Sequence, residues 1–162
     1  YEPMLLMVAL GFYLASGSFS VGDILTGAHM NILRMPGIFF GLCFILLIKF
    51  RKSPFDISMS HEAHQELIGG LKTEISGRTL AVVEIAHWYE NVFLFGLVLL
   101  FFASDTWWTW LLGLAICEIV FFAEILIDNC CARIKWERML ASTWLVGLMA
   151  GFLNIAFLMY FK

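Results

Sequence analysis

Three titratable side chains, Glu84, His87 and Glu90, recur at intervals of three residues within the apolar stretch LAVVEIAHWYENVFLFGLVLLFF. Residues three apart lie near one face of an α-helix, so this spacing predicts a polar ladder that climbs about two turns. Carboxyl and imidazole groups inside a membrane segment are rare, and they mark ion paths and proton relays. These three side chains are therefore the first candidates for moving a proton.

Glu118 and Glu124 place two further carboxylates in the next apolar stretch. A carboxylate at membrane depth costs about 3 kcal/mol unless it is paired, hydrated or protonated. One interpretation is that both groups continue the ion path. The alternative is that they form structural hydrogen bonds between helices, and the sequence leaves both interpretations open.

The composition predicts that these groups lie in an integral membrane protein. Of the 162 residues, 61% are hydrophobic and 14% are charged, with a mean hydropathy of +0.86 and a net charge of −3. Soluble domains carry about 25% charged residues, so a soluble core is excluded. The cysteines have no metal-ligand spacing, and we expect apolar, membrane-embedded thiols at Cys43, Cys117, Cys130 and Cys131.

Five apolar segments are long enough to cross a bilayer, which takes about 17–25 residues each. They predict an all-α, polytopic transmembrane helix bundle, with one membrane domain over residues 1–162. The expected spans cover residues 4–21, 32–50, 79–103, 107–127 and 142–161. Because residue 1 is tyrosine and an apolar segment follows almost at once, we expect a fragment of a longer chain that lacks its first helices.

Basic residues are distributed unevenly between the connections. They occur in residues 51–78 and 128–141, whereas residues 22–31 and 104–106 hold no lysine or arginine. The positive-inside rule then places the loops 51–78 and 128–141 in the cytoplasm, in a cell inner (cytoplasmic) membrane. The tryptophans at 107, 108 and 110 fit an aromatic belt at the opposite surface.

Residues 51–78 form the longest polar segment and hold several acids and histidines. The segment has a helix-ending Ser53-Pro54 pair, and then a short stretch that is typical of an amphipathic helix. The sequence His61-Glu62-Ala63-His64 lacks the spacing of a zinc-binding HExxH helix, so we expect a solvated or interface surface and no metal site.

The motifs SPFDI, QELIGGLKTEISG, EIAHWYE and ARIKWERML resemble the large ion-translocating membrane subunit of energy-converting (Ech-type, group 4) NiFe hydrogenases and formate hydrogenlyase. That subunit is similar to subunit 1 of respiratory complex I, whose comparable stretch has the form PFD, EAE and ELxxGxxxEYSG. The resemblance covers essentially the whole chain and corresponds to the last five helices of the subunit. His64 and Ile75 depart from the complex I pattern, and EIAHWYE favours the hydrogenase branch.

The resemblance implies a subunit without catalytic residues and without a cofactor of its own. The NiFe centre and Fe–S clusters would lie in partner subunits: the hydrogenase large and small subunits and an Fe–S subunit, beside an antiporter-like membrane subunit. Electrons from ferredoxin or formate would reduce protons to H2 in that soluble arm, and this chain would couple the reaction to proton or sodium translocation. Lipid is the remaining partner, and no nucleic acid is expected.

The resemblance also assigns roles to residues. The expected ion pathway comprises Asp56, Glu62, Glu66, Glu74, Glu84, His87, Glu90, Glu118 and Glu124. The expected docking surface for the soluble arm comprises Arg51, Lys52, His61, His64, Arg133, Lys135 and Arg138. Two alternatives remain: a complex I-type subunit that lines a quinone site, and a passive membrane anchor whose carboxylates are structural.

Overall fold

A computed structural model describes residues 2–27, 30–50, 75–132 and 134–160. These residues form helices joined by turns, and no strand occurs among them. The predicted all-α bundle is therefore confirmed for the described part of the chain. The elements in chain order are α1 (Glu2–Ser16), α2 (Val21–Leu25), the 3-10 turn η1 (Asn31–Leu33), α3 (Pro36–Lys49), α5 (Arg78–Phe102), α6 (Trp107–Cys130), α7 (Trp136–Val146), the π-helical segment η3 (Gly147–Phe152) and α8 (Leu153–Tyr160).

The first two apolar helices are shorter than the apolar segments that contain them. α1 stops at Ser16 because Gly17 takes a positive φ of 80°, a conformation that ends helices. α3 starts at Pro36, where the fixed φ of proline suits a first helical position and its missing N–H costs no hydrogen bond. The expected spans 4–21 and 32–50 thus include residues that lie in the connection between α1 and α3.

The connection after α6 is also shorter than the polar sequence suggests. α6 continues through Asp128 and Asn129 to Cys130, and α7 already begins at Trp136. The Asn129 side chain donates to the Ile125 carbonyl at 2.8 Å, within its own helix. Polar residues here extend the helix, so most of the expected loop 128–141 is helical.

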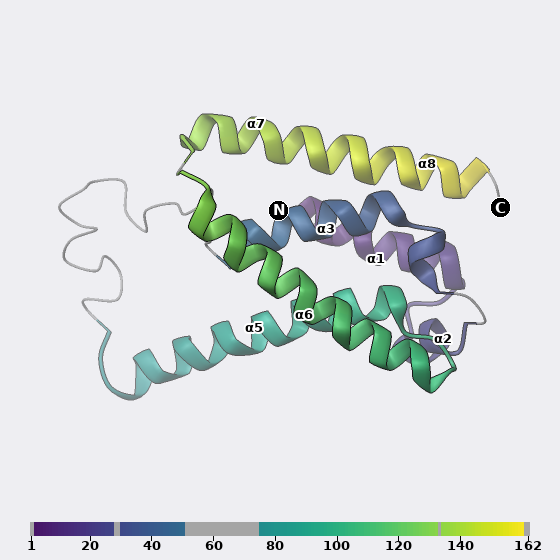
Figure 1. Ribbon diagram of the computed structural model, residues 1–162, viewed down its shortest axis with the longest axis horizontal. Helices are drawn as coiled ribbons and strands as arrows, with labels where there is room; N and C mark the ends of the chain where they lie inside the picture. The colour runs from purple at the N-terminus through teal and green to yellow at the C-terminus, as the bar shows by residue number, and fades with distance from the viewer. Residues whose placement is uncertain (1, 28–29, 51–74, 133, 161–162) are drawn as a thin grey trace.

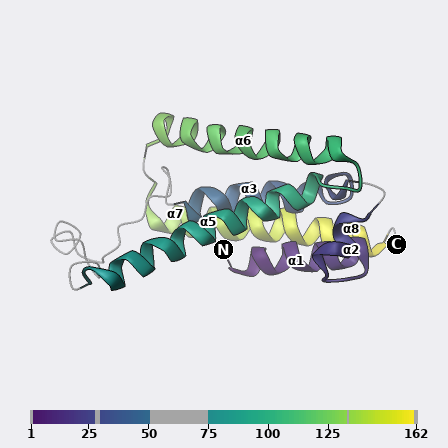
Figure 2. The same cartoon turned by 90° about the horizontal axis from the view of Figure 1, so that it is seen from below.

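The helices form two neighbouring groups (Figure 1). α1 and α3 pack against each other and against the continuous rod of α7, η3 and α8. α5 and α6 form an antiparallel hairpin, and α5 packs on α3 and η1. In the view from below, α6 lies at the edge of the bundle, on the far side of α5 and α3 from α1 (Figure 2).

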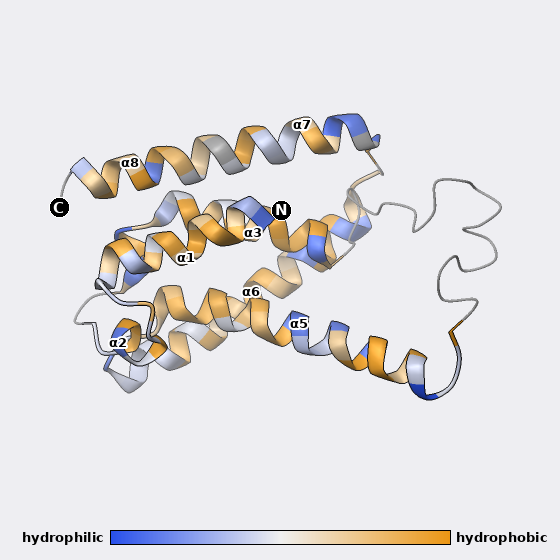
Figure 3. Ribbon diagram, turned by 180° about the vertical axis from the view of Figure 1, so that it is seen from behind, coloured by the Kyte–Doolittle hydropathy of each residue, from blue (hydrophilic) through white to orange (hydrophobic). Residues whose placement is uncertain are grey.

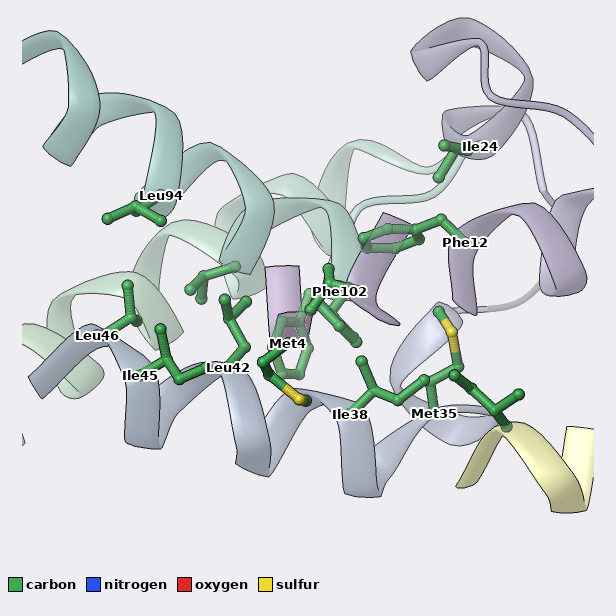
Figure 4. Close-up of a cluster of buried hydrophobic side chains, with 14 residues drawn as sticks. Met4, Phe12, Ile24, Met35, Ile38, Leu42, Ile45, Leu46, Leu94 and Phe102 are labelled. Atoms are coloured by element: carbon green, nitrogen blue, oxygen red, sulfur yellow. The ribbon is translucent and has the colours of Figure 1, made fainter. Parts of the chain in front are cut away.

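The core lies where α1, α3 and α5 meet (Figure 4). α3 contributes side chains at helical spacing, Ile38, Leu42 and Ile45, all almost inaccessible to solvent. They face Leu94 and Phe102 on α5. Lipid tails are as apolar as these side chains, so in a membrane it is their close van der Waals packing that holds α3 against α5.

Glycines let α3 approach its neighbours closely. A methyl group built on Gly37 would lie 2.8 Å from the backbone carbonyl oxygen of Ala150 in η3. One built on Gly11 would lie 2.7 Å from the Ile38 Cδ1 and 2.8 Å from the Met35 Sδ. Small residues at helix crossings are the usual means of close packing between membrane helices.

Three helices are long and apolar enough to cross a membrane: Arg78–Phe102, Trp107–Cys130 and Glu137–Tyr160. α1 and α3 are shorter apolar helices. Apolar residues predominate along α1, α3 and α6, whereas hydrophilic residues interrupt the first half of α5 (Figure 3). Large apolar side chains such as Leu6, Phe122 and Leu153 are more than half exposed, as expected for an integral membrane protein.

Candidate functional site

An ion pair joins α3 to α5. The Nζ of Lys49, the last residue of α3, contacts the Oε1 of Glu90 in the middle of α5. The Lys49 side chain is 15% exposed and that of Glu90 is 42% exposed, so the pair lies at the margin of the bundle. A lysine at a helix C-terminus is favoured by the helix dipole, and its long chain lets the ammonium group reach the neighbouring helix.

Glu84 and His87 lie on the same helix as Glu90, and both are half-buried. α5 is regular from Arg78 to Phe102, so the three-residue spacing places these side chains along neighbouring turns, as the ladder requires. Lys49 meets this row at its third member, Glu90. The part of these residues in ion movement remains a prediction.

Glu124 is the most buried carboxylate among the described residues, with 3% of its surface exposed. It projects from α6 toward α3, where it lies within electrostatic range of the Cys43 thiol. A carboxyl group at membrane depth is costly to bury, and such groups are commonly functional. α3 thus faces a carboxylate from α5 at Lys49 and one from α6 at Cys43.

Glu118 is exposed, in contrast to Glu124. The two residues are six positions apart on α6, which separates them by about 120° around the helix axis. They therefore lie on different faces, and only Glu124 faces the interior of the described bundle. An ion path that included both would have to leave the bundle at Glu118.

Two of the expected docking residues are described. Lys135 precedes α7 and Arg138 lies in its first turn, and both are exposed at the same end of the bundle as the C-terminus of α6. The remaining expected residues lie outside the described part of the chain: Arg51, Lys52, Asp56, His61, Glu62, His64, Glu66, Glu74 and Arg133.

Two basic residues have structural partners that the sequence does not predict. From the sequence alone, Lys49 is only a charged residue next to the polar segment. A lysine at the end of one apolar helix and a glutamate within the next could have signalled the ion pair. Arg34 falls within an expected span, but it lies in the connection before α3 and donates from Nη1 to the Ala15 carbonyl at 2.9 Å. It thereby caps the C-terminus of α1, where carbonyl groups lack helical partners.

Buried polar groups at the other end of α5 have structural roles. The Asn31 amide donates to the Leu100 carbonyl at 3.3 Å, which ties η1 to the last turn of α5. In the turn to α6, the Thr109 hydroxyl accepts from the Ser104 backbone N–H at 3.1 Å. These bonds satisfy backbone groups of helix ends that water reaches poorly, and they hold the α5–α6 hairpin together.

The chain is similar to curated proteins named as the H subunit of NADH-quinone oxidoreductase. It is 26% identical to the protein of that name from Syntrophotalea carbinolica, over 96% of this chain and 48% of that protein. It is 25% identical to the one from Methylococcus capsulatus, over 96% of this chain and 50% of that protein. The one from Thermomicrobium roseum is 28% identical, over 96% and 49% respectively. No solved structure matches the chain.

The chain spans about half the length of these relatives. The family model described as NADH dehydrogenase matches residues 1–159, nearly the whole sequence. This match confirms the resemblance to the membrane subunit of complex I, whereas the narrower resemblance to hydrogenases is not shown. The chain, an integral membrane protein by its long apolar helices, belongs to the NADH dehydrogenase family.

Proposed function

We propose that this chain is the membrane subunit through which a complex I-type oxidoreductase couples electron transfer to ion movement. The observation that carries the proposal is the ion pair between Lys49 and Glu90, which joins two apolar helices. Membrane proteins keep few charged side chains within their spans, and those that they keep are commonly functional. The chain would supply the charges, and partner subunits would hold the redox centres.

We infer that docking of the soluble arm would act on this ion pair. Lys49 ends α3 and Arg78 begins α5, so the polar segment between them connects the two helices that carry the pair. Docking of an electron-carrying partner at this end would shift one helix relative to the other. Glu90 would then lose its cation, and a carboxylate without a cation in apolar surroundings takes up a proton.

Release of Glu90 would supply the ion-moving step. Its proton would arrive by way of Glu84 and His87, which lie on the cytoplasmic side of Glu90 on the same helix. The next acceptor would be Glu124, buried on α6. Restoration of the pair with Lys49 would expel the proton from Glu90 and reset the helix pair. The acids expected at 56, 62, 66 and 74 would form the entrance.

The electron acceptor of the complex is proposed to be a quinone. The similar curated proteins carry the name NADH-quinone oxidoreductase, and the matched family is that of NADH dehydrogenase. Their likeness to this chain extends over 96% of it, including α5 and the polar segment before it. This chain would line one wall of the quinone site, next to the soluble arm.

A second candidate is the membrane subunit of an energy-converting hydrogenase, in which protons are the electron acceptor. The observation that favours it is the stretch EIAHWYE at 84–90, which places two acids and a histidine on α5 and resembles the hydrogenase form. In this case the partners would be the nickel-binding large subunit, the small subunit and an Fe–S subunit. The coupling role of Lys49 and Glu90 would be the same.

In either case we propose that the end of the bundle with Lys135 and Arg138 faces the cytoplasm and the soluble arm. The basic residues on this side outnumber those on the other, where Arg34 is held as the cap of α1. Basic side chains here would pair with acids of the soluble arm or with anionic lipid. The bacterial inner membrane is the proposed location.

Purification of the complete complex and its reconstitution into vesicles would test the proposal. Reduction of an added quinone coupled to ion uptake supports the complex I-type function, and hydrogen evolution coupled to ion uptake without quinone supports the hydrogenase function. The variant Glu90→Gln should keep electron transfer and lose uptake, while Asp105→Asn, in the turn between α5 and α6, should change neither. Wild-type uptake in Glu90→Gln would leave this chain as a passive anchor.

A further inference from the structure

A π-helical segment interrupts the rod formed by α7 and α8. η3 (Gly147–Phe152) joins the two helices without a break, and the rod runs alongside α3 (Figure 1). In a π-helix each N–H bonds the carbonyl five residues back, so the segment accommodates an extra residue, and such segments are frequent at functional sites. Two of the six residues of η3 are glycines, which restrict the backbone least.

The rod contacts the first turn of α3 at this interruption. The carbonyl oxygen of Ala150 lies 2.8 Å, and the Cβ of Asn154 3.2 Å, from the position that a methyl group on Gly37 would take. The Oδ1 of Asn154 is buried, and within the described part of the chain nothing donates a hydrogen bond to it. A buried amide oxygen without a donor carries the cost of its lost hydration. The amide therefore does not favour the position in which the π-helical segment places it.

Conversion of η3 to α-helix would turn α8 relative to α7. An α-helix turns about 100° and rises about 1.5 Å per residue, so taking the extra residue into the α-helical ladder rotates all that follows by about 100°. Leu153 would then occupy the place of Asn154 beside Gly37. A leucine side chain of similar size would replace the amide at the contact, and the amide would turn away from α3.

The neighbours of η3 on α1 can follow such a rotation. The thioether groups of Met4 and Met7 lie beside Gly151. Methionine side chains are unbranched and adapt their shape to a moving surface. The contact at Gly37 involves backbone on both sides and is less adaptable. A turn of the rod would therefore be passed on to α3 more than to α1.

We propose that η3 is a hinge with a π-helical register and an α-helical register, and that the change between them moves the first turn of α3. Lys135 and Arg138 lie at the start of the rod, at the proposed docking end, and α3 ends at Lys49. The hinge thus lies between the docking end and the ion pair. Its link to the ion pair rests on the proposed function, whereas the change of register does not.

Photo-cross-linking within the intact membrane complex tests the two registers. After removal of the soluble arm at high salt, a leucine-sized diazirine residue in place of Asn154 should capture the first turn of α3, and the same residue in place of Leu153 should not. With the arm attached, the probe at 153 should capture that peptide and the probe at 154 should lose it. Leu145, exposed on α7 before the hinge, is the control position and should give the same products in both conditions.

Deletion of Met149 should lock the hinge. It removes the extra residue, so η3 becomes α-helical while α8 keeps its present face on α3. The probe at 154 should then capture α3 with and without the arm. An exchange between 153 and 154 that persists in the deletion variant would overturn the proposal.

The cross-links of the undeleted chain decide the question even where the deletion prevents assembly. Capture of α3 from 154 alone, with and without the arm, would overturn the hinge. Normal ion uptake in that same complex would leave the proposed function standing. An exchange of cross-links in a complex that takes up no ions would support the hinge and contradict the proposed function.

Discussion

The ammonium group of Lys49 at the end of α3 is paired with the carboxylate of Glu90 in the middle of α5. The two residues are separated in sequence by the polar segment that is expected to meet the soluble arm, yet they join the two helices that this segment links. A change in nearby charge and a shift of either helix would therefore both act on the Lys49–Glu90 pair. The ion pair would thus connect the proposed docking surface to the titratable side chains of α5.

Removal of one partner of the pair should cost more than removal of both. Lys49→Met leaves the Glu90 carboxylate without its cation, and we expect a loss of about 1–3 kcal/mol because the pair is partly exposed. The double variant Lys49→Met with Glu90→Leu should regain most of that loss. Unfolding of the purified protein in detergent, followed by loss of helical circular dichroism, measures each value. Additive effects of the two substitutions would show that the ion pair contributes nothing.

Glu84→Gln and His87→Leu should leave the complex assembled but reduce ion uptake per electron. Both side chains are half-buried on α5 in the row that leads to Glu90, and each variant removes a group that takes up or releases a proton. Ile85→Val, exposed on the same helix, is the matched control. A proton-uptake assay in vesicles gives the result, and normal coupling in both variants would exclude the proposed path.

Close helix packing should make Gly37 far more sensitive to substitution than Gly96. An alanine methyl at Gly37 would lie 2.8 Å from the Ala150 carbonyl oxygen, which is backbone and cannot move aside without shifting η3. We expect Gly37→Ala to destabilise by about 1–3 kcal/mol. At Gly96 nothing lies within 4 Å, and alanine there should stabilise by about 0.5–1 kcal/mol through its helix propensity. Thermal unfolding in detergent would detect the opposite signs, and equal effects would refute the packing argument.

Charge reversal at the start of α7 should weaken attachment of the soluble subunits. Lys135→Glu combined with Arg138→Glu replaces two exposed cations at the proposed docking end. Co-purification of the soluble arm should fall, most clearly at low salt, where exposed charges are least screened. Arg34→Gln, at the opposite end of the bundle, should leave attachment unchanged. Full retention of the arm by the double variant would count against the docking role.

Much of the fold follows from hydropathy, because apolar helices dominate the sequence and proline and glycine set several helix ends. Pro36 begins α3 and Gly17 follows α1, both as local rules require. The polar stretch after α6 differs from the prediction, because Asp128 and Asn129 lie in the helix and not in a loop. The backbone hydrogen bonds of a helix form both inside and outside the membrane. A helix can therefore continue through polar residues that lie outside the membrane.

The candidate site was only partly predictable. The row of Glu84, His87 and Glu90 depends on spacing within one helix, which a sequence displays directly. The partnership of Lys49 with Glu90 depends on which helices are neighbours, and a single sequence contains no direct record of that. For the same reason, the sequence suggests one role for Glu118 and Glu124, although Glu118 is exposed and Glu124 is buried.

Ion uptake per electron in vesicles containing the complete complex with both Lys49→Gln and Glu90→Gln is the most direct test of the coupling role. These substitutions remove the two charges and retain side chains of similar size, so the complex should assemble and transfer electrons. We predict that uptake per electron falls to the level of vesicles made permeable by an uncoupler. Uptake per electron equal to that of the wild type, with electron transfer unchanged, would contradict it.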